Sequence, residues 1–182
     1  MRLTRAATLF ALLPVVCLAE TIPEPTEYRM DTYRAPVPAS IAGGTVVGPK
    51  AAYALWQDGG AAFIDVMPQA PKPQNLPEGT IWREKPRESI PGAIWLANVG
   101  YGAIANVTQT YFREGLQNAT NGDRNYPVVM FCLADCWMSW NAAKRAIEWG
   151  YSEVYWMPEG TDGWAALSYP LESVLPAKPQ DD

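Results

Sequence analysis

Short apolar runs alternate with helix-like stretches along most of this sequence. The clearest run, residues 128–131, leads through a short loop into an amphipathic stretch at 139–149 that ends at Gly150. Strands that are buried on both faces read as continuous apolar runs, and parallel strands need crossover helices between them. The pattern therefore predicts an α/β fold in which helices cover both faces of a central, mostly parallel sheet. The other predicted strands are 45–47, 61–66, 93–96 and 154–157, and the other predicted helices are 50–57, 107–117 and a short one within 158–171.

The first 19 residues have the pattern of a secretory signal peptide. Arg2 and Arg5 precede an apolar stretch at 8–18, and the small residue Ala19 follows it. This stretch is too short to remain as a membrane-spanning helix, so we expect cleavage after Ala19. The mature chain is then predicted to be exported to the periplasm, without a membrane span.

Shifts in composition predict how the rest of the chain is organised. Residues 20–44 are rich in proline and predict an extended N-terminal arm. Residues 45–175 are predicted to form one domain, because a chain of this length can bury a single core. Within that domain, residues 67–89 contain five prolines and predict an irregular insertion that covers a site, grips a partner or is a solvated loop. Residues 176–182 are left as a C-terminal tail.

Charge and the absence of histidine exclude several classes of function. The formal net charge is −5, and it becomes −7 when Arg2 and Arg5 are removed with the signal peptide. Nucleic acid and anionic membrane surfaces are therefore poor partners, whereas a basic protein would suit this charge. Without histidine the chain has no Ser-His or Cys-His nucleophile pair, no His-ligated zinc and no C-x-x-C-H haem attachment. We predict no cofactor.

Cys132 and Cys136 are the candidate catalytic residues. Cys132 directly follows the apolar run at 128–131 and precedes the helix predicted at 139–149. Free backbone N–H groups at a helix N-terminus stabilise a thiolate, so Cys132 is predicted to be the attacking sulfur and Cys136 the resolving one. The alternative is a permanent structural disulfide, although closing so small a ring contributes only about 2 kcal/mol in the chain-entropy model.

The residues around the two cysteines are predicted to form the loop and pocket of the site. Ser139 is the expected N-cap of the following helix. Asp135 either tunes the acidity of the pair or serves as a turn residue, and Trp137 either covers the sulfurs or packs in the core. Soft sulfur ligands here would suit Cu(I), but we predict no metal site because the neighbouring methionine in the strand should be buried. The remaining members of the predicted pocket are Leu133, Ala134 and Met138.

Several motifs together resemble a single rhodanese domain over residues 45–171. The strand at 63–66 contains an aspartate, residues 90–94 read Ile-Pro-Gly-Ala-Ile, and the run at 128–131 ends in Cys132, the position of the catalytic cysteine in that family. The closing pattern is similar at Gly150-Tyr151, Val154-Tyr155 and Gly163-Trp164. The resemblance implies a rhodanese-like fold, with Asp65 and Trp164 in structural roles.

The loop after Cys132 departs from that of typical sulfurtransferases, which carry a glycine and an arginine before a small hydroxyl residue. Here the loop reads Asp135, Cys136, Trp137, Met138, so the anion-binding cation is missing and thiosulfate is a poor candidate substrate. The chain is similar to exported rhodanese-like proteins of the CXXCW-motif family, associated with pyrroloquinoline-quinone (PQQ)-dependent alcohol oxidation.

That similarity implies a sulfurtransferase-like or thiol-disulfide protein, with a quinoprotein dehydrogenase, a cytochrome or a thiol reductant as its partner in the periplasm. The competing hypothesis is a non-catalytic binding or assembly module for the same dehydrogenase system. The lost loop arginine favours the second reading, and the pair of thiols favours the first.

Overall fold

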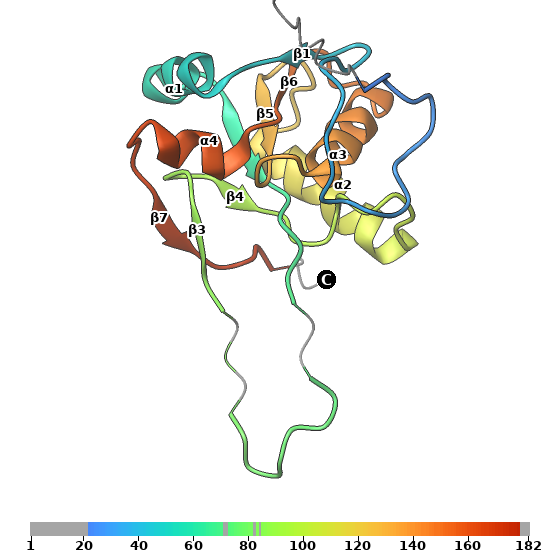
Figure 1. Cartoon of the computed structure of the whole chain (residues 1–182), viewed down its shortest axis with the longest axis vertical. Coiled ribbons are helices and arrows are strands. Elements are labelled where there is room, and N and C mark those ends of the chain that lie inside the picture. Colours follow the sequence, from blue (N-terminus) through green and yellow to red (C-terminus); the bar gives the residue numbers. More distant parts are fainter. Residues whose placement is uncertain (1–21, 71–72, 82, 84, 179–182) are drawn as a thin grey trace, which may run out of the picture.

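The computed structural model describes residues 22–70, 73–81, 83 and 85–178 (Figure 1). The predicted signal peptide, residues 1–19, lies outside the described residues, as does the end of the predicted tail, residues 179–182. None of the helices in the described part of the chain is both long enough and apolar enough to cross a membrane.

A five-stranded parallel sheet forms the centre of the domain, as the sequence predicts. The strand order is β1-β6-β5-β2-β4, and every neighbouring pair is parallel. Strand β5 is entirely buried and lies between β2 and β6, so its continuous apolar sequence follows from its central position. The strands are β1 (Thr45–Val46), β2 (Ala62–Asp65), β4 (Ile94–Trp95), β5 (Val128–Phe131) and β6 (Val154–Met157).

Helices cover both faces of this sheet, and alternate residues of each strand face the two layers. Helices α2 (Asn106–Ala119) and α3 (Trp137–Glu148) pack on the face to which Met130 belongs. Helices α1 (Pro49–Asp58) and α4 (Gly160–Ala166) pack on the opposite face, in the cluster that contains Phe131. The predicted fold class is therefore confirmed.

Two elements differ from the sequence-based prediction. Helix α3 begins at Trp137, two residues before Ser139, and its N-cap is Cys136. The segment at 158–171 forms α4, and the chain then continues into a short strand, β7 (Glu172–Val174). Strand β7 pairs antiparallel with β3 (Arg87–Ser89), which lies inside the segment predicted to be irregular. This pairing joins short, polar segments that are far apart in the chain, so no local sequence pattern predicts it.

The N-terminal arm packs against the domain. In Figure 1 the blue segment passes beside α3. The side chain of Asn141 on α3 accepts a hydrogen bond from the backbone N–H of Arg29 at 2.9 Å and donates one to the Arg29 carbonyl at 2.8 Å. The indole N–H of Trp140 also donates to the Ser40 carbonyl at 3.3 Å. These bonds hold the arm over the start of α3.

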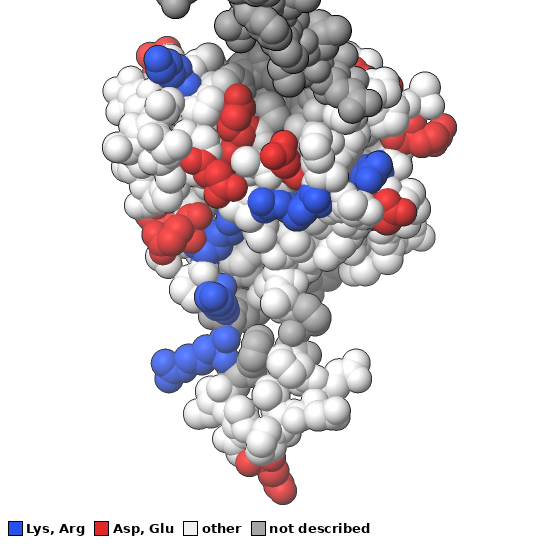
Figure 2. Space-filling model, in the orientation of Figure 1, with Lys and Arg blue, Asp and Glu red and all other residues white. Residues whose placement is uncertain are grey.

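The described parts of the 67–89 insertion extend away from the body of the domain in Figure 1. Residues 73–75 and 77–81 are exposed there, and Ile81 keeps 79% of its surface accessible. Figure 2 shows charges of both signs on the face of the domain from which the insertion extends. Among the described residues of the insertion, those that pack against the domain lie at its two ends.

Candidate functional site

The two cysteines lie together at the carboxyl edge of the sheet. Cys132 directly follows β5, and Cys136 is the N-cap of α3. The loop between them brings their Sγ atoms to 2.7 Å, and both thiols are free. Ligands of parallel α/β sheets gather at this edge, so the pair occupies the place where chemistry is expected.

Cys136, not Cys132, has the more acidic thiol. The pKa of Cys136 is lowered to about 7, mainly by its hydrogen bond with Cys132 and also by backbone N–H groups, including those of Met138 and Ser139 in the first turn of α3, against the opposing effect of burial. The pKa of Cys132 is raised by its hydrogen bond to Cys136, then by burial and by the nearby charge of Asp65. The sequence predicts the ionised sulfur at Cys132, whereas the directions of these two pKa shifts favour Cys136 as the thiolate of the pair. The helix begins at Trp137, so its free N–H groups lie nearer to Cys136.

The carbonyl oxygen of Cys132 anchors the cysteine loop to two other elements. It accepts hydrogen bonds from the Thr161 backbone N–H at 2.9 Å, the Arg87 guanidinium at 3.1 Å and the Thr161 hydroxyl at 3.3 Å. Gly160 lies against this carbonyl with a φ of 51°, and a Cβ atom there would collide with it. The loop conformation is thus fixed by α4 and β3 rather than by the loop alone.

Asp65 supports the loop from beneath, at the end of β2. Its fully buried carboxylate accepts hydrogen bonds from the Arg87 Nε, the Ser89 hydroxyl and the Met67 backbone N–H. Burial raises the pKa of Asp65, and the Arg87 guanidinium acts in the opposite direction. Arg87 consequently joins the buried carboxylate to the carbonyl of Cys132. Sequence reasoning missed Arg87, because it lies in an apparently irregular, proline-rich segment.

The other predicted loop residues differ in their surroundings. Leu133 and Ala134 are half-buried, and Ala134 donates its backbone N–H to Asp162 at 3.0 Å. Asp135 is exposed and has a φ of 51°, as expected of a turn residue. The carboxylate of Asp65 contributes to the raised pKa of Cys132.

The predicted pocket residues of α3 are buried within the domain. Ser139 is not the N-cap; its hydroxyl donates to the Cys136 carbonyl at 2.8 Å and accepts from the Trp156 indole at 3.0 Å. Trp137 and Met138 each keep only 3% of their surface accessible.

Trp164 belongs to the core cluster on one face of the sheet, whereas Cys132 and Cys136 belong to the cluster on the other face. It packs with the rings of Tyr53, Trp56 and Tyr169. Its indole N–H donates to the Pro170 carbonyl at 2.7 Å. These contacts connect α1, α4 and the segment that follows α4.

The N-terminal arm closes the site above Cys136. Arg34 forms an antiparallel bridge with Cys136, and the Trp137 backbone N–H donates to the Tyr33 carbonyl at 2.9 Å. The Trp137 indole donates to the Pro36 carbonyl at 3.1 Å. Beneath the arm Cys136 keeps only 2% of its surface accessible, and Cys132, at the end of β5, keeps none. Access to either sulfur therefore requires a local movement.

Releasing the arm should expose Cys136. Replacing Asn141 with alanine removes the two hydrogen bonds to Arg29, together with one to the Gly100 carbonyl within the domain. The two bonds to the arm, at about 1 kcal/mol each, correspond to roughly a tenfold larger open population or more. We expect iodoacetamide to label Cys136 about tenfold faster in this variant, measured by mass spectrometry on a Cys132→Ser background. Asn118→Ala, on the exposed side of α2, is the matched control. Equal labelling rates in the two variants would show that the arm does not close the site.

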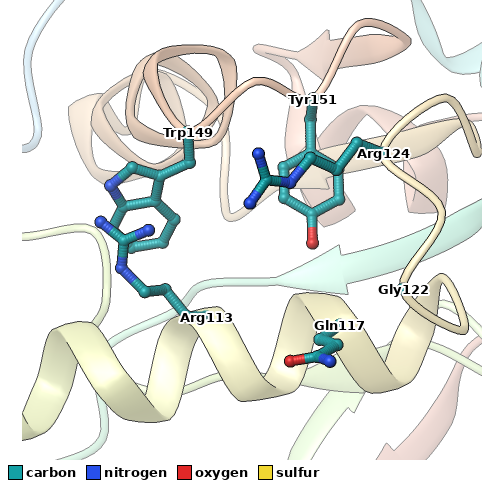
Figure 3. A pocket seen from close by; sticks show the side chains of 6 residues that line it. All are labelled: Arg113, Gln117, Gly122, Arg124, Trp149 and Tyr151. Carbon is teal, nitrogen blue, oxygen red and sulfur yellow. The ribbon is translucent and has the colours of Figure 1, made fainter.

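Two cavities lie at opposite edges of the sheet. One, of about 620 Å³, is lined by Met67, Leu133 and other residues near the cysteine loop. The other, of about 230 Å³, lies near the amino end of β5 between α2 and the end of α3 (Figure 3). In the second cavity Arg113 lies 3.9 Å over the ring of Trp149, with Arg124 and Tyr151 opposite. Of these two cavities, the first is the one that approaches the sulfurs.

Among residues 22–70, 73–81, 83 and 85–178, no cluster of three acidic, cysteine or histidine side chains could hold a metal ion.

Comparisons with known proteins find similarity only among solved structures. No protein-family model matches the chain, and no curated protein matches its sequence. The polysulfide-sulfur transferase homodimer from Wolinella succinogenes is 19% identical with a TM-score of 0.47, over 72% of this chain and 80% of that one. A rhodanese-like domain from Anabaena sp. is 14% identical with a TM-score of 0.45, over 75% of this chain and 87% of that one.

A third solved structure, an EanB variant in complex with hercynine, is 20% identical with a TM-score of 0.49, over 72% of this chain but 32% of that one. At these identities the similarity shows the fold alone. The chemistry of the site must be inferred from the geometry of its own residues.

Proposed function

We propose that this chain is a rhodanese-like thiol protein that exchanges disulfides or handles sulfane sulfur through Cys132 and Cys136. The observation that carries this proposal is the 2.7 Å separation of two free sulfurs, one of which belongs to Cys136, the N-cap residue of α3, and has a pKa of about 7. A disulfide requires a separation of about 2.0 Å, so small side-chain rotations would complete the bond. The pair can therefore alternate between dithiol and disulfide without a change of fold.

The hydrogen-bonded thiols of Cys132 and Cys136 allow two reactions, each of which balances in atoms and electrons. In the first, one cysteine attacks an external disulfide, and its neighbour then displaces the mixed disulfide; two electrons pass to the external compound, which leaves as two thiols. In the second, Cys132 attacks the outer sulfur of a sulfane-sulfur donor; the donor's S–S bond breaks, the rest of the donor leaves as a thiolate, and Cys132 carries a persulfide. Cys136 then attacks the Sγ of Cys132. The Cys132–Cys136 disulfide forms and hydrosulfide leaves. Both reactions end in the same oxidised pair, which an external dithiol must reduce.

For the biological setting we propose the periplasm and a PQQ-dependent alcohol oxidation system. The support is the signal-like N-terminus and the resemblance of the cysteine-tryptophan segment to that family. Three residues separate Cys132 from Cys136, one more than the family's CXXCW name denotes. A quinoprotein dehydrogenase, its cytochrome or a thiol reductant is the proposed partner, and the acidic net charge favours one with a basic surface.

A non-catalytic binding or assembly module is the second candidate. It is favoured by the burial of both sulfurs and by the missing cation in the loop. A strain that carries Cys132→Ser together with Cys136→Ser separates the two functions. Normal growth on the alcohol supports assembly, whereas failed growth at normal protein levels supports thiol chemistry.

The direct test is mass spectrometry of the reduced protein after titration with sulfane-sulfur donors and with thioredoxin-like proteins. We expect either an added sulfur on Cys132 or the loss of two hydrogen atoms as the Cys132–Cys136 disulfide forms. In the Cys136→Ser variant, the adduct on Cys132 should persist because no neighbouring thiol resolves it. If neither cysteine is modified under any of these conditions, the proposed thiol chemistry is wrong.

A further inference from the structure

The cavity of about 620 Å³ next to the cysteine loop has the size of a small-molecule site. It lies at the carboxyl edge of the sheet, between the start of the insertion, β3 and α4. Its lining includes the apolar side chains of Met67, Trp95, Leu133, Ala165 and Leu171. Such a surface favours a ligand with a hydrophobic body.

Met67 separates this cavity from the sulfur of Cys132. Its side chain lines the cavity, and its Sδ lies 3.5 Å from the Sγ of Cys132. The backbone of Met67 is fixed, because its N–H donates to Asp65 and its carbonyl accepts the Trp95 indole N–H at 2.6 Å. The unbranched thioether side chain, by contrast, has three rotatable bonds. It can therefore swing aside while the strand end stays in place.

The charges around the cavity do not select a small inorganic anion. Arg87 is engaged by Asp65 and by the Cys132 carbonyl, and it is only partly exposed. The other charged lining residues are of both signs: Lys85, Glu88 and Asp162. Because the lining holds two basic and two acidic residues, its net charge does not favour an anion or a cation. The apolar side chains therefore determine which ligands bind.

We propose that this cavity is the entrance through which small apolar disulfides reach Cys132, and that Met67 is its gate. The proposal rests on the thiol function proposed above and names the substrate class of that site. Met67 is a specificity-determining residue here, because its side chain lies between the bound substrate and the sulfur that attacks it.

The reaction balances without a further reactant. Cys132 passes its proton to the Cys136 thiolate and attacks one substrate sulfur; the substrate S–S bond breaks, and a first thiolate leaves. Cys136 then gives that proton to the departed thiolate and attacks the Sγ of Cys132. The Cys132–Cys136 bond forms and a second thiolate leaves. Two electrons pass from the cysteine pair to the substrate.

The test compares two chromogenic disulfides of similar size on the reduced protein: neutral dipyridyl disulfide and dianionic dithiobis(nitrobenzoate). Each rate is divided by the rate with free N-acetylcysteine, which removes the intrinsic difference between the reagents. We expect the protein to favour the neutral reagent by about tenfold or more. Met67→Ala should accelerate the neutral reagent about tenfold, because opening no longer requires the side chain to move.

Two further variants keep the test specific. Met67→Leu fills the same space and should react at close to the original rate. Ala165→Trp fills the exposed side of the cavity and should slow the neutral reagent about tenfold, while hydrogen peroxide still oxidises the pair at the original rate. Unchanged rates in both Met67→Ala and Ala165→Trp would overturn the entrance while leaving the thiol function intact. Failure of every oxidant to form the Cys132–Cys136 disulfide would instead overturn the thiol function.

Discussion

In the reduced Cys132→Ala variant, the pKa of Cys136 should rise from about 7 toward the ordinary thiol value near 8.5. The hydrogen bond from Cys132 is the main cause of the lowered value, and alanine cannot donate it. Serine can, so Cys132→Ser should keep the pKa of Cys136 near 7. The two variants differ by one oxygen atom, which makes them a matched pair.

The effect is large at neutral pH. A thiol with a pKa near 7 is about half ionised there, whereas one with a pKa near 8.5 is only a few per cent ionised. The thiolate content of Cys132→Ala at pH 7 should therefore be roughly tenfold lower than that of Cys132→Ser. The ultraviolet absorbance of the thiolate, followed as a function of pH, measures this directly. Identical titrations of the two variants would show that helix α3, rather than the neighbouring sulfur, sets the acidity.

The sign of the pH dependence follows from the lowered pKa. Alkylation or exchange at Cys136 requires the thiolate, so its rate should rise as the pH increases through about 7 and level off above it. In Cys132→Ala the rise should shift to higher pH. A wild-type rate that still increases steeply above pH 8 would contradict the assignment of the thiolate to Cys136.

Replacing Arg87 with alanine should destabilise the fold by about 3–5 kcal/mol, the usual result of removing one partner of a buried ion pair. The variant leaves the carboxylate of Asp65 fully buried, with hydrogen bonds from Ser89 and Met67 but without a neutralising charge. It also removes a donor to the Cys132 carbonyl. Urea denaturation followed by circular dichroism measures the loss.

Controls separate charge from geometry at this position. Arg83→Ala, in the exposed part of the insertion, should change stability little. Arg87→Lys keeps the charge and should recover part of the loss. Protonation of Asp65 removes the buried charge, so the deficit of Arg87→Ala should shrink as the pH falls. A deficit that is small at pH 7, or that grows on acidification, would show that the ion pair does not support the loop.

The sheet could be predicted because its central strands are buried on both faces. Strands β2, β5 and β6 are each four residues long and mostly apolar, and their sequences alone mark them. Strands β3 and β7 could not be predicted in this way. They are three residues long and largely polar, and each depends on a partner more than 80 residues away in the chain.

The start of α3 shows a different limit. Ser139 has the chemistry of an N-cap, whereas cysteine is not among the residues that usually cap a helix. Trp137 and Met138 also form an apolar first turn, which would be unfavourable in water. The arm buries that turn, and its docking could not be inferred from the local sequence.

The cysteine pair was recognisable because it directly follows the continuous apolar run at 128–131. Its environment was not, since Met67 and Arg87 come from the two ends of the insertion and meet the loop only in three dimensions. Which of the two cysteines keeps its proton likewise depends on where α3 begins. The sequence predicted that start at Ser139, two residues too late.

The N-terminal arm, which covers Cys136, docks on α3, a helix formed by a much later part of the chain. Arg29 and Asn141 are 112 positions apart, so their contact cannot form until most of the polypeptide has emerged and folded. Until then the sulfurs meet whatever oxidants and reductants surround the nascent protein. The redox state reached before the arm docks is therefore the state in which the folded molecule starts its exchange with external thiols and disulfides.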